Sequence, residues 1–291
     1  MIIADESWRE LLNILKIEDE QKSVYVIGCS DSGKTTFCRY LLENLLGKFL
    51  TAYIDCDPGQ SVIGPPTTVG MEIYESKVLS DSKQYLMFTG STSPKGHLLQ
   101  NLTSIKCLVD FANKSGVQRL VIDSSGFVLG GIAQEFQYNV IQLIKPDFIV
   151  AFQREDELEG ILKNFNKYRQ LKIFRFTVSE HVRQRTSLER QIYREEKFRG
   201  YFKVVQENKI NIDDYGFHGR IPGPGILKQK NRLFSLNDDI GFVIALGIVK
   251  EVDTENKTII FFSPPFDMEK VSNIQIGDVF LEPSGREIKG E

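Results

Sequence analysis

The sequence predicts an α/β protein in which a parallel sheet is flanked by helices, followed by an arginine-bearing helix and a small C-terminal β-rich domain. Three observations support this prediction. Short apolar runs alternate with amphipathic stretches through the first two-thirds of the chain, a pattern typical of a parallel sheet wrapped by helices. A glycine-rich loop joins the first apolar run to the first amphipathic stretch. After residue 178 the chain becomes polar and helical, and paired β-like runs follow.

The expected strands are short apolar runs bounded by glycine, proline or charge, as in strands that are buried on both faces. They cover residues 24–27, 50–55, 85–89, 119–123, 148–152 and 173–178. Amphipathic stretches at 35–46, 98–115, 133–144 and 155–168 predict the intervening helices. Right-handed crossovers would bring the carboxyl ends of the strands, and any site, to one edge of the sheet.

The last third of the chain lacks the alternation of apolar and amphipathic stretches. Residues 179–203 predict one polar lid helix, residues 216–227 are rich in glycine and proline, and residues 241–283 predict a small antiparallel β unit. We therefore expect a core domain at residues 1–204, which includes the helix at 179–203, and a C-terminal domain at residues 205–291.

Composition excludes several classes of protein. The chain has 291 residues, of which 41% are hydrophobic and 26% charged. These values argue against a disordered, collagen-like or coiled-coil chain. Lys and Arg number 36 against 39 Asp and Glu, a net charge of -3. A globally basic nucleic-acid binder is therefore excluded, whereas a local basic cluster is not.

The sequence predicts a cytoplasmic protein without a membrane partner. The amino terminus lacks the pattern of a signal peptide, and no apolar run approaches the ~18 residues that cross a bilayer. The four cysteines have no CxxC spacing, so we expect neither zinc nor required disulfides.

The most specific motif is GCSDSGKT at residues 28–35, which matches GxxxxGK[ST] between a strand and a helix. In such a P-loop, backbone N–H groups and the helix amino terminus surround phosphates. Lys34 would reach the β- and γ-phosphates of ATP, and Thr35 would hold Mg²⁺. The residues predicted to contact the nucleotide here are Gly28, Ser30, Asp31, Ser32, Gly33, Lys34, Thr35 and Thr36.

Two carboxylates follow predicted strands beside this loop. Asp57 lies in DCDPGQ, and Asp123 ends the apolar run RLVID. Carboxylates at this edge suit metal coordination and deprotonation of an acceptor hydroxyl. We predict Thr35, Asp57 and Asp123 as metal ligands and favour Asp57 as the base; which aspartate is nearer to the metal stays open.

Five segments in order resemble the P-loop polynucleotide 5′-hydroxyl kinases, a family that includes the eukaryotic pre-mRNA 3′-end cleavage-factor kinase and the nucleolar rRNA-processing kinase. The segments are GCSDSGKT, DCDPGQSVIGPPTT, GSTSPKGH, DSSGFVLGG and RQRTSLERQIYR. The resemblance implies an enzyme that uses ATP and Mg²⁺ to phosphorylate the 5′-OH ends of RNA or DNA.

The resemblance also implies roles for individual residues. Lys34 and Asp57 would be catalytic, together with the lid arginines Arg190 and Arg194, and Arg185 would contact ATP. The nucleic-acid contacts that it implies are Gln60, Ser91, Thr92, Ser93 and Phe127. The phenylalanine stands where the family has a base-stacking tryptophan, and DSSG stands where the family often has Asn-Thr before the glycine.

The arginine-rich stretch has a second interpretation from its residues alone. Arg190 and Arg194 are four residues apart and share a helix face, so they form either a solvated surface with weak ion pairs or a clamp for phosphates. The P-loop favours the clamp. His181 and His218 are expected to be structural or solvent-facing.

Two other functions fit the motifs. One is a different P-loop enzyme, either a small-molecule kinase or an NTPase; a GTPase is disfavoured because AFQRED stands where NKxD would occur. The other is a non-catalytic, ATP-bound scaffold in RNA processing. Protein partners are not indicated by the sequence.

Overall fold

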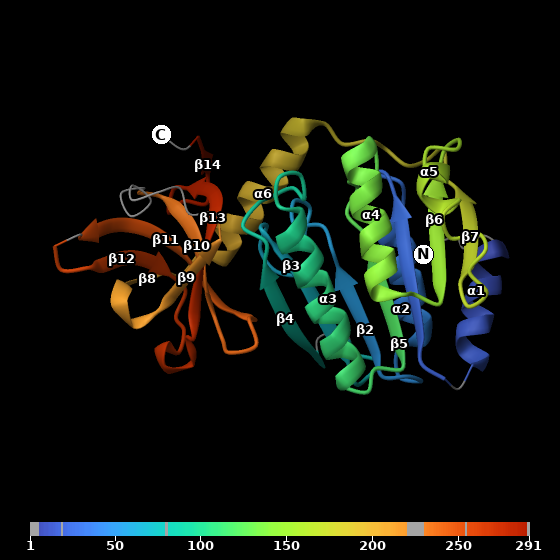
Figure 1. Ribbon diagram of the computed structural model, residues 1–291, viewed down its shortest axis with the longest axis horizontal. Helices are drawn as coiled ribbons and strands as arrows, with labels where there is room; N and C mark the ends of the chain where they lie inside the picture. Colours follow the sequence, from blue (N-terminus) through green and yellow to red (C-terminus); the bar gives the residue numbers. More distant parts are fainter. Residues whose placement is uncertain (1–5, 19, 79–80, 220–229, 254, 290–291) are drawn as a thin grey trace. The chain divides into compact units, whose positions relative to one another are not determined.

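The computed structural model in Figure 1 describes residues 6–18, 20–78, 81–219, 230–253 and 255–289. Two compact units make up the chain. The first comprises Met1–Asp57, Val69–Tyr85 and Pro94–Arg185, and the second comprises Pro58–Thr68, Leu86–Ser93 and Thr186–Glu291. The second unit thus takes two short segments from the first third of the chain.

The first unit is built on a sheet with strand order β4-β3-β2-β5-β1-β6-β7. Its strands are β1 (Lys22–Gly28), β2 (Thr51–Asp55), β3 (Thr68–Tyr74), β4 (Ser82–Phe88), β5 (Arg119–Asp123), β6 (Phe148–Gln153) and β7 (Lys172–Thr177). β2, β5, β1, β6 and β7 run parallel, whereas β3 is antiparallel to β2. The sheet is therefore mixed.

Helices cover both faces of this sheet. They are α1 (Glu6–Ile17), α2 (Lys34–Leu45), α3 (Leu98–Lys114), α4 (Gly131–Ile144) and the short α5 (Glu159–Leu162). Figure 1 shows α3 and α4 side by side across one face, and α2 lies on the other. The expected α/β class is confirmed, and each predicted strand is found within a few residues of its expected position.

Three elements of this unit differ from expectation. β3 was not predicted. α1 was not predicted either; its Trp8 packs into an aromatic cluster with Phe37, Tyr40, Phe152 and Phe176. The helix expected at 155–168 is limited to α5. Before it, the Glu157 carboxylate accepts hydrogen bonds from the backbone N–H groups of Arg154 and Glu155. Such a local side-chain turn competes with helix formation.

The second unit consists mainly of a twisted sheet with order β14-β13-β10-β11-β12-β8, in which β9 also pairs with β13. Its strands are β8 (Gln206–Asn211), β9 (Gly216–Gly219), β10 (Arg232–Asn237), β11 (Val243–Asp253), β12 (Thr258–Ser263), β13 (Asn273–Leu281) and β14 (Glu287–Ile288). All pairs are antiparallel except β9 with β13. The expected β-rich C-terminal part is confirmed. The glycine- and proline-rich segment 216–227 begins with β9, and its residues 220–227 lie outside the described ranges.

The polar helix α6 (Ser187–Tyr201) is shorter than the helix expected at residues 179–203. Thr186 caps it: its side chain accepts from the backbone of Glu189, and the Glu189 carboxylate accepts from the backbone of Thr186. This capping box fixes the start of the helix. Arg183 and Arg185 therefore precede the helix, whereas Arg190 and Arg194 share it.

Helix α6 belongs to the second compact unit because its apolar side packs on the C-terminal sheet. Phe198 and Phe202 join a buried cluster with Leu233, Leu246 and Leu281. The compact units thus divide at residues 185 and 186, whereas the domain boundary predicted from the sequence lies at 204 and 205. The boundary at 204 and 205 stays a prediction of where two independently folding domains meet.

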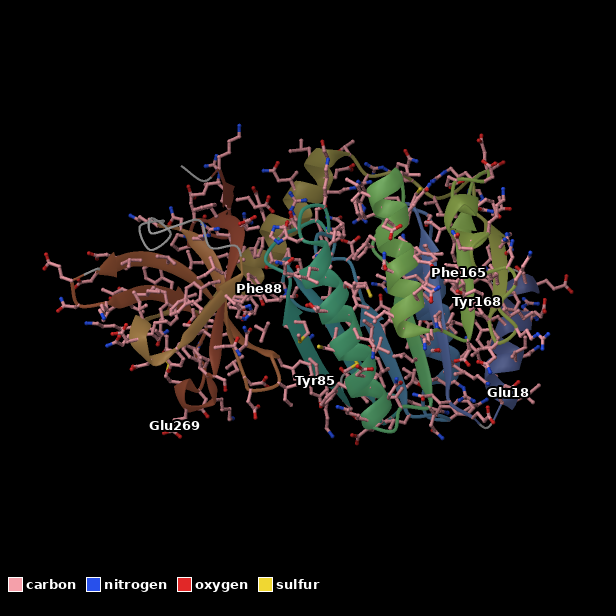
Figure 2. All side chains as sticks on the ribbon, viewed as in Figure 1. Glu18, Tyr85, Phe88, Phe165, Tyr168 and Glu269 are labelled. Atoms are coloured by element: carbon pink, nitrogen blue, oxygen red, sulfur yellow. The ribbon has the colours of Figure 1, made fainter. Side chains whose placement is uncertain are left out.

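The two side chains of β4 that Figure 2 labels, Tyr85 and Phe88, belong to different compact units. The Tyr85 ring packs against Phe111 of α3, with ring centroids 4.6 Å apart. Phe88 instead joins the cluster that holds Phe198 of α6. The segment that follows β4 is consequently built onto the second unit.

Within the described ranges, no helix combines the length and apolar character that a bilayer crossing requires. All four cysteines are free thiols; Cys38 and Cys56 are buried, Cys29 is half-buried and Cys107 is exposed.

We predict that Phe198→Ala destabilises the second unit selectively by about 3–5 kcal/mol, because a fully buried ring is replaced by a cavity. Urea unfolding should be followed by circular dichroism and by the fluorescence of Trp8, the only tryptophan, which lies in the first unit. The ellipticity should show a transition at a lower urea concentration than in wild type. The urea midpoint that is followed by Trp8 fluorescence should stay unchanged.

Leu188→Ala on the same helix is the control, because this side chain is 63% exposed and its loss should change stability by less than about 0.5 kcal/mol. A parallel shift of the Trp8 midpoint in Phe198→Ala would contradict the assignment of α6 to the second unit.

Candidate nucleotide site

The loop between β1 and α2 has the backbone conformation that phosphate binding needs. Gly33 has φ 93°, in the left-handed region that glycine adopts without strain. A Cβ on Gly28 would lie 2.7 Å from the carbonyl oxygen of Phe152 and 2.7 Å from Ser32 Oγ. A Cβ on Gly126 would likewise collide with the backbone of Ser30. These glycines let three segments meet closely around the loop.

Lys34 and Thr35 begin α2 and face the carboxyl ends of the central strands. Lys34 is buried, and its Nζ donates to the carbonyl oxygens of Gly28 at 2.9 Å and Cys29 at 2.8 Å. Thr35 Oγ1 donates to Asp123 Oδ2 at 2.6 Å. The lysine and the hydroxyl predicted from the motif thus lie together at the amino terminus of one helix, where backbone N–H groups favour anions.

Asp123 is a buried carboxylate at the centre of this site. It is 3% exposed, and Tyr53 Oη also donates to its Oδ2, at 3.1 Å. Burial raises the pKa of the Asp123 carboxyl, while the Lys34 ammonium and the hydrogen bonds from Thr35 and Tyr53 act in the opposite direction. Oδ1 is buried and has no hydrogen-bond partner among the described residues.

The arrangement fits Mg²⁺. A threonine hydroxyl, a carboxylate with one unused buried oxygen and the phosphates of a nucleotide are the oxygen ligands that this ion takes in P-loop proteins. Within the described part of the chain, no group of three or more His, Cys, Asp or Glu side chains could hold a metal by itself.

Two further carboxylates lie at the end of β2. Asp55 is buried and is paired in register with Asp123 of β5. Asp57 is half-buried, and its backbone N–H donates to Asp55 Oδ1 at 3.0 Å. Its charge raises the pKa of the Asp123 carboxyl, so the two predicted metal ligands affect each other. The direct bond from Thr35 brings Asp123 to the hydroxyl that is predicted to hold the metal. The roles of Asp123 as metal ligand and of Asp57 as base stay predictions.

A cavity of about 410 Å³ opens beside the loop. It is lined by P-loop residues and by a segment after β7, namely Asp31, Ser32, Gly33, Lys34, Thr35, Thr36, His181, Val182, Arg183 and Arg185. Ser32 Oγ is buried with no hydrogen-bond partner in the described ranges. The cavity has the size of a small-molecule site, and its polar wall suits phosphates.

Arg185 is fixed against the P-loop. Its Nε and its backbone N–H each donate to the Asp31 carboxylate at 2.9 Å, and the Asp31 side chain is only 6% exposed. Arg154 Nη2 also donates to the Asp31 carbonyl, at 3.1 Å. The structure thus brings the predicted ATP contacts Asp31 and Arg185 to the same cavity.

The other predicted residues are divided between the units. Phe127 lies in the first unit, half-buried, with its ring centroid 6.2 Å from that of Phe136. Those in the second unit are Gln60, Ser91, Thr92, Ser93, Arg190 and Arg194. Gln60 Nε2 donates to the Arg190 carbonyl at 3.3 Å, and Ser93 N donates to Ser91 Oγ at 3.3 Å.

Arg194 has a contact that the sequence did not predict. Its Nε and Nη2 donate to the two carboxylate oxygens of Glu287 in β14, at 2.5 and 3.0 Å. Both side chains are largely buried, and such a two-point ion pair is stronger than a single contact. A phosphate contact by Arg194 stays a prediction and has to compete with Glu287.

Sequence reasoning missed several residues of the site. His181 is exposed, as expected, but it also lines the cavity together with Val182 and Arg183. Tyr53 was not selected either. The sequence could have identified Tyr53, because it lies two residues before Asp55 and therefore on the same face of β2. The contacts of the segment after β7 had no such signal.

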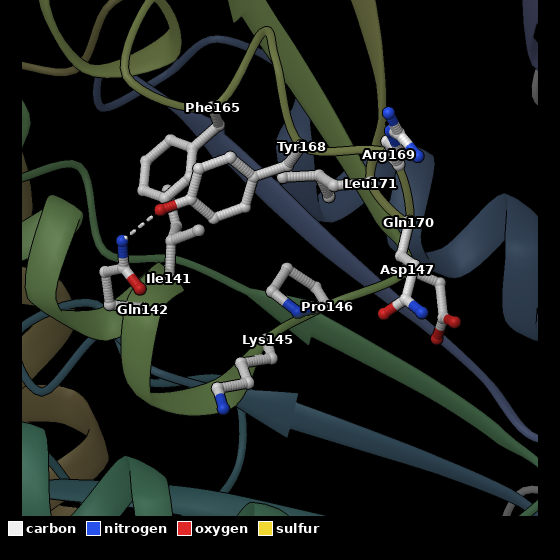
Figure 3. A pocket seen from close by; sticks show the side chains of 10 residues that line it. All are labelled: Ile141, Gln142, Lys145, Pro146, Asp147, Phe165, Tyr168, Arg169, Gln170 and Leu171. Atoms are coloured by element: carbon white, nitrogen blue, oxygen red, sulfur yellow. Dashed lines mark hydrogen bonds between the residues drawn. The ribbon is translucent and has the colours of Figure 1, made fainter.

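A second cavity, of about 390 Å³, lies at the opposite ends of the strands. Figure 3 shows Tyr168 beside Phe165, with Gln142 Nε2 donating to Tyr168 Oη at 2.6 Å. Its residues precede β6 and β7, and none is a predicted site residue. Ligands of open α/β sheets bind at the carboxyl ends of the strands, so we assign the nucleotide to the P-loop cavity.

We predict that Asp123→Asn stabilises the metal-free protein at pH 7 and abolishes Mg²⁺-dependent ATP binding. The folded-state pKa of Asp123 is raised, so ionisation costs stability in full above that pKa. The cost falls as the pH drops below it and vanishes below the lower pKa of the unfolded chain. The thermal midpoint in EDTA should rise at pH 7, and the difference from wild type should shrink in acid.

Asp110→Asn is the matched control, because that carboxylate pairs with Lys106 on the surface of α3 and should change the midpoint little. A lower midpoint for Asp123→Asn at pH 7 would show that the carboxylate is stabilising.

Comparison with known proteins agrees with this geometry. Residues 28–204 match the family described as mRNA cleavage and polyadenylation factor CLP1 P-loop. A polyribonucleotide 5′-hydroxyl-kinase of Pyrococcus abyssi is 30% identical over 99% of this chain and 96% of its own length. One of Methanocaldococcus jannaschii is 27% identical over 96% of this chain and 92% of its own.

Solved structures show the same fold. The Clp1p chain in the wild-type Clp1p–Pcf11p complex has a TM-score of 0.71 to this chain at 11% identity, covering 93% of this chain and 78% of that one. With the P-loop geometry and the matched residues 28–204, this chain belongs to the CLP1 P-loop family.

Proposed function

We propose that this protein is an ATP-dependent polynucleotide 5′-hydroxyl kinase that transfers the γ-phosphoryl group of ATP to the 5′-OH end of RNA. The observation that carries the proposal is the buried bond between Thr35 and Asp123 beside Lys34, with Asp57 two residues beyond β2. The choice of RNA as the acceptor rests on the archaeal relatives, which resemble the chain over nearly its whole length and are named polyribonucleotide 5′-hydroxyl-kinases.

The proposed reaction is an in-line displacement at the γ-phosphorus. The 5′-oxygen of the acceptor forms a new bond to phosphorus, the bond from phosphorus to the β,γ-bridging oxygen breaks, and ADP leaves. Asp57 accepts the proton of the 5′-hydroxyl. Lys34 stabilises charge on the β- and γ-phosphates. Thr35 and Asp123 would hold Mg²⁺, which when bound neutralises phosphate charge.

The second unit supplies the proposed phosphate clamp and all of the proposed acceptor contacts except Phe127, which belongs to the first unit. Gln60 and the serine and threonine side chains at 91–93 offer hydrogen bonds to a nucleic-acid backbone. Arg190 is proposed as a clamp on the transferred group, with Arg194 as a second arginine. Phe127 offers an aromatic face to a base. His181, Val182 and Arg183 are proposed contacts of ATP beyond its phosphates, because they line the P-loop cavity.

We also propose a cytoplasmic setting. The four cysteines are free thiols, and a reducing compartment keeps thiols in this state.

The proposed activity is tested by transfer of label from γ-labelled ATP to a 5′-OH RNA oligonucleotide. Asp57→Asn should lower kcat by about 10²–10⁴-fold, since a positioned general base contributes that much, and should leave ATP binding unchanged. Asp81→Asn, in the loop before β4, is the control and should retain full activity.

Three other acceptors separate the rival functions. A 5′-phosphorylated RNA should take up no label, and a 5′-OH DNA measures sugar preference. Transfer to a mononucleoside but not to RNA would indicate a small-molecule kinase. ATP binding by wild type without transfer to any acceptor would indicate a scaffold.

The role of Arg194 is tested by comparing Arg194→Met with Glu287→Gln. If the arginine acts on phosphates, Arg194→Met should lower kcat at least about 10²-fold, whereas Glu287→Gln, which keeps the guanidinium, should retain kcat. Steady-state kinetics with saturating ATP and RNA measure both. Equal losses in the two variants would show that the pair with Glu287 is the function of Arg194.

A further inference from the structure

The segment Pro58–Thr68, which follows the proposed base, is bonded to one face of α6. Three bonds from side-chain donors to backbone carbonyls make the contact. They are Gln60 Nε2 to Arg190 O at 3.3 Å, Tyr193 Oη to Ser61 O at 2.8 Å, and Lys197 Nζ to Val62 O at 3.0 Å. The helix residues are three and four apart, so they form a single stripe. We call Pro58–Thr68 the acceptor loop.

The acceptor loop is joined to a second loop at Thr67. This residue is fully buried and has φ 74°, a conformation that β-branched residues rarely adopt. Its carbonyl oxygen accepts from Thr89 N at 2.8 Å, Thr89 Oγ1 at 2.9 Å and Gly90 N at 3.3 Å. Strain of this kind persists only where the surroundings hold it, and it clusters at functional sites. We call Leu86–Ser93, which comprises the end of β4 and the loop after it, the clasp loop.

The clasp loop is bonded in turn to the C-terminal sheet. The backbone N–H of Asp278 in β13 donates to the Gly90 carbonyl at 2.7 Å. A Cβ on Gly90, whose φ is 77°, would lie 3.1 Å from Cα of Gly277. Arg232 is 4% exposed and donates to both β13 residues, to Gly277 O at 2.7 Å and Asp278 Oδ1 at 3.0 Å. The contact is therefore backbone to backbone, with a buried cation behind it.

Helix α6, which holds the acceptor loop, packs on the same sheet. Phe198 and Phe202 are buried among the leucines of β10, β11 and β13. The Tyr201 hydroxyl accepts from the backbone N–H of Leu246 at 2.9 Å. The acceptor loop is thus connected to the sheet through α6, and the clasp loop is bonded to β13 directly. The Thr67 carbonyl bonds the two loops to each other.

We infer that the C-terminal sheet supports the RNA-binding loops, and that Tyr193 and Lys197 are positioning residues that set the affinity for the acceptor. The inference rests on the proposed function for the identity of the acceptor, a 5′-OH RNA end. It gives the C-terminal part of the chain a role in RNA binding, because both loops are bonded to it or to α6, which packs on it. Neither side chain is needed to bind ATP, which is assigned to the first unit.

The test uses the full-length variants Tyr193→Phe, Lys197→Met and the double variant. Each removes a donor to an acceptor-loop carbonyl and keeps most of the side-chain bulk. Loss of one such bond should weaken RNA binding about five-fold, and the double variant should lose more than either. The Michaelis constant for RNA should rise accordingly, while kcat at saturating RNA, the Michaelis constant for ATP and the thermal midpoint stay unchanged.

Two matched changes in the first unit are the controls. Tyr138→Phe removes a hydroxyl bonded to Gln142, and Lys106→Met removes an ammonium paired with Asp110. Both should leave RNA binding unchanged.

RNA affinity is measured by the fluorescence anisotropy of a 3′-labelled 5′-OH RNA, which does not depend on transfer. Wild-type binding without transfer would overturn the proposed kinase activity and leave this inference testable. Unchanged RNA affinity in the double variant would overturn the inference. A parallel change in the thermal midpoint and both Michaelis constants would also overturn it, because the residues would then be merely structural.

Discussion

The nucleotide side of this protein depends on one buried carboxylate. Asp123 ends the central strand β5, receives hydrogen bonds from Thr35 and Tyr53, and keeps one oxygen unused. Burial opposes its ionisation, so the carboxylate is held where it costs stability in the absence of a cation. Such a cost is expected at a site that is built for a ligand. Gly28 and Gly126 also belong to this site, because the absence of a Cβ lets neighbouring segments lie close to the phosphate-binding loop.

The proposed chemistry is divided between two differently built units. The phosphate-binding loop, Asp57 and the cavity beside α2 belong to an α/β sheet, where helix amino termini and strand ends supply fixed dipoles. The acceptor and clasp loops leave that sheet and are bonded to α6 and a largely antiparallel sheet. A net charge of -3 is compatible with this division, because the predicted contacts with RNA are a few hydroxyls, amides and arginines.

Local patterns made much of the fold and the phosphate site predictable. The P-loop spacing identified Lys34 and Thr35, since the chemistry and the turn are encoded within eight residues. The start of α6 was also encoded, in the Thr186 and Glu189 capping box, but the mostly polar stretch before it suggested a longer helix. β3 was missed because a run containing Gly70 and Glu72 lacks a clear strand pattern.

Contacts between distant segments could not be predicted. The pairing of Arg194 with Glu287 joins residues 93 positions apart, and only tertiary packing brings them together. The strained backbone of Thr67 likewise has no local signal, because its sequence neighbours are ordinary turn residues. Sequence reasoning therefore found the residue types of the site and missed the scaffold that holds the acceptor loops.

Amide hydrogen exchange of the intact protein tests the division of roles most directly. An ATP analogue with Mg²⁺ should slow exchange in residues 28–36 and 179–185, and a 5′-OH RNA should slow it in residues 58–68 and 86–93. Protection of residues 58–68 and 86–93 by the nucleotide alone, or of residues 28–36 by RNA alone, would contradict the account that the P-loop binds the donor and the acceptor and clasp loops bind the acceptor.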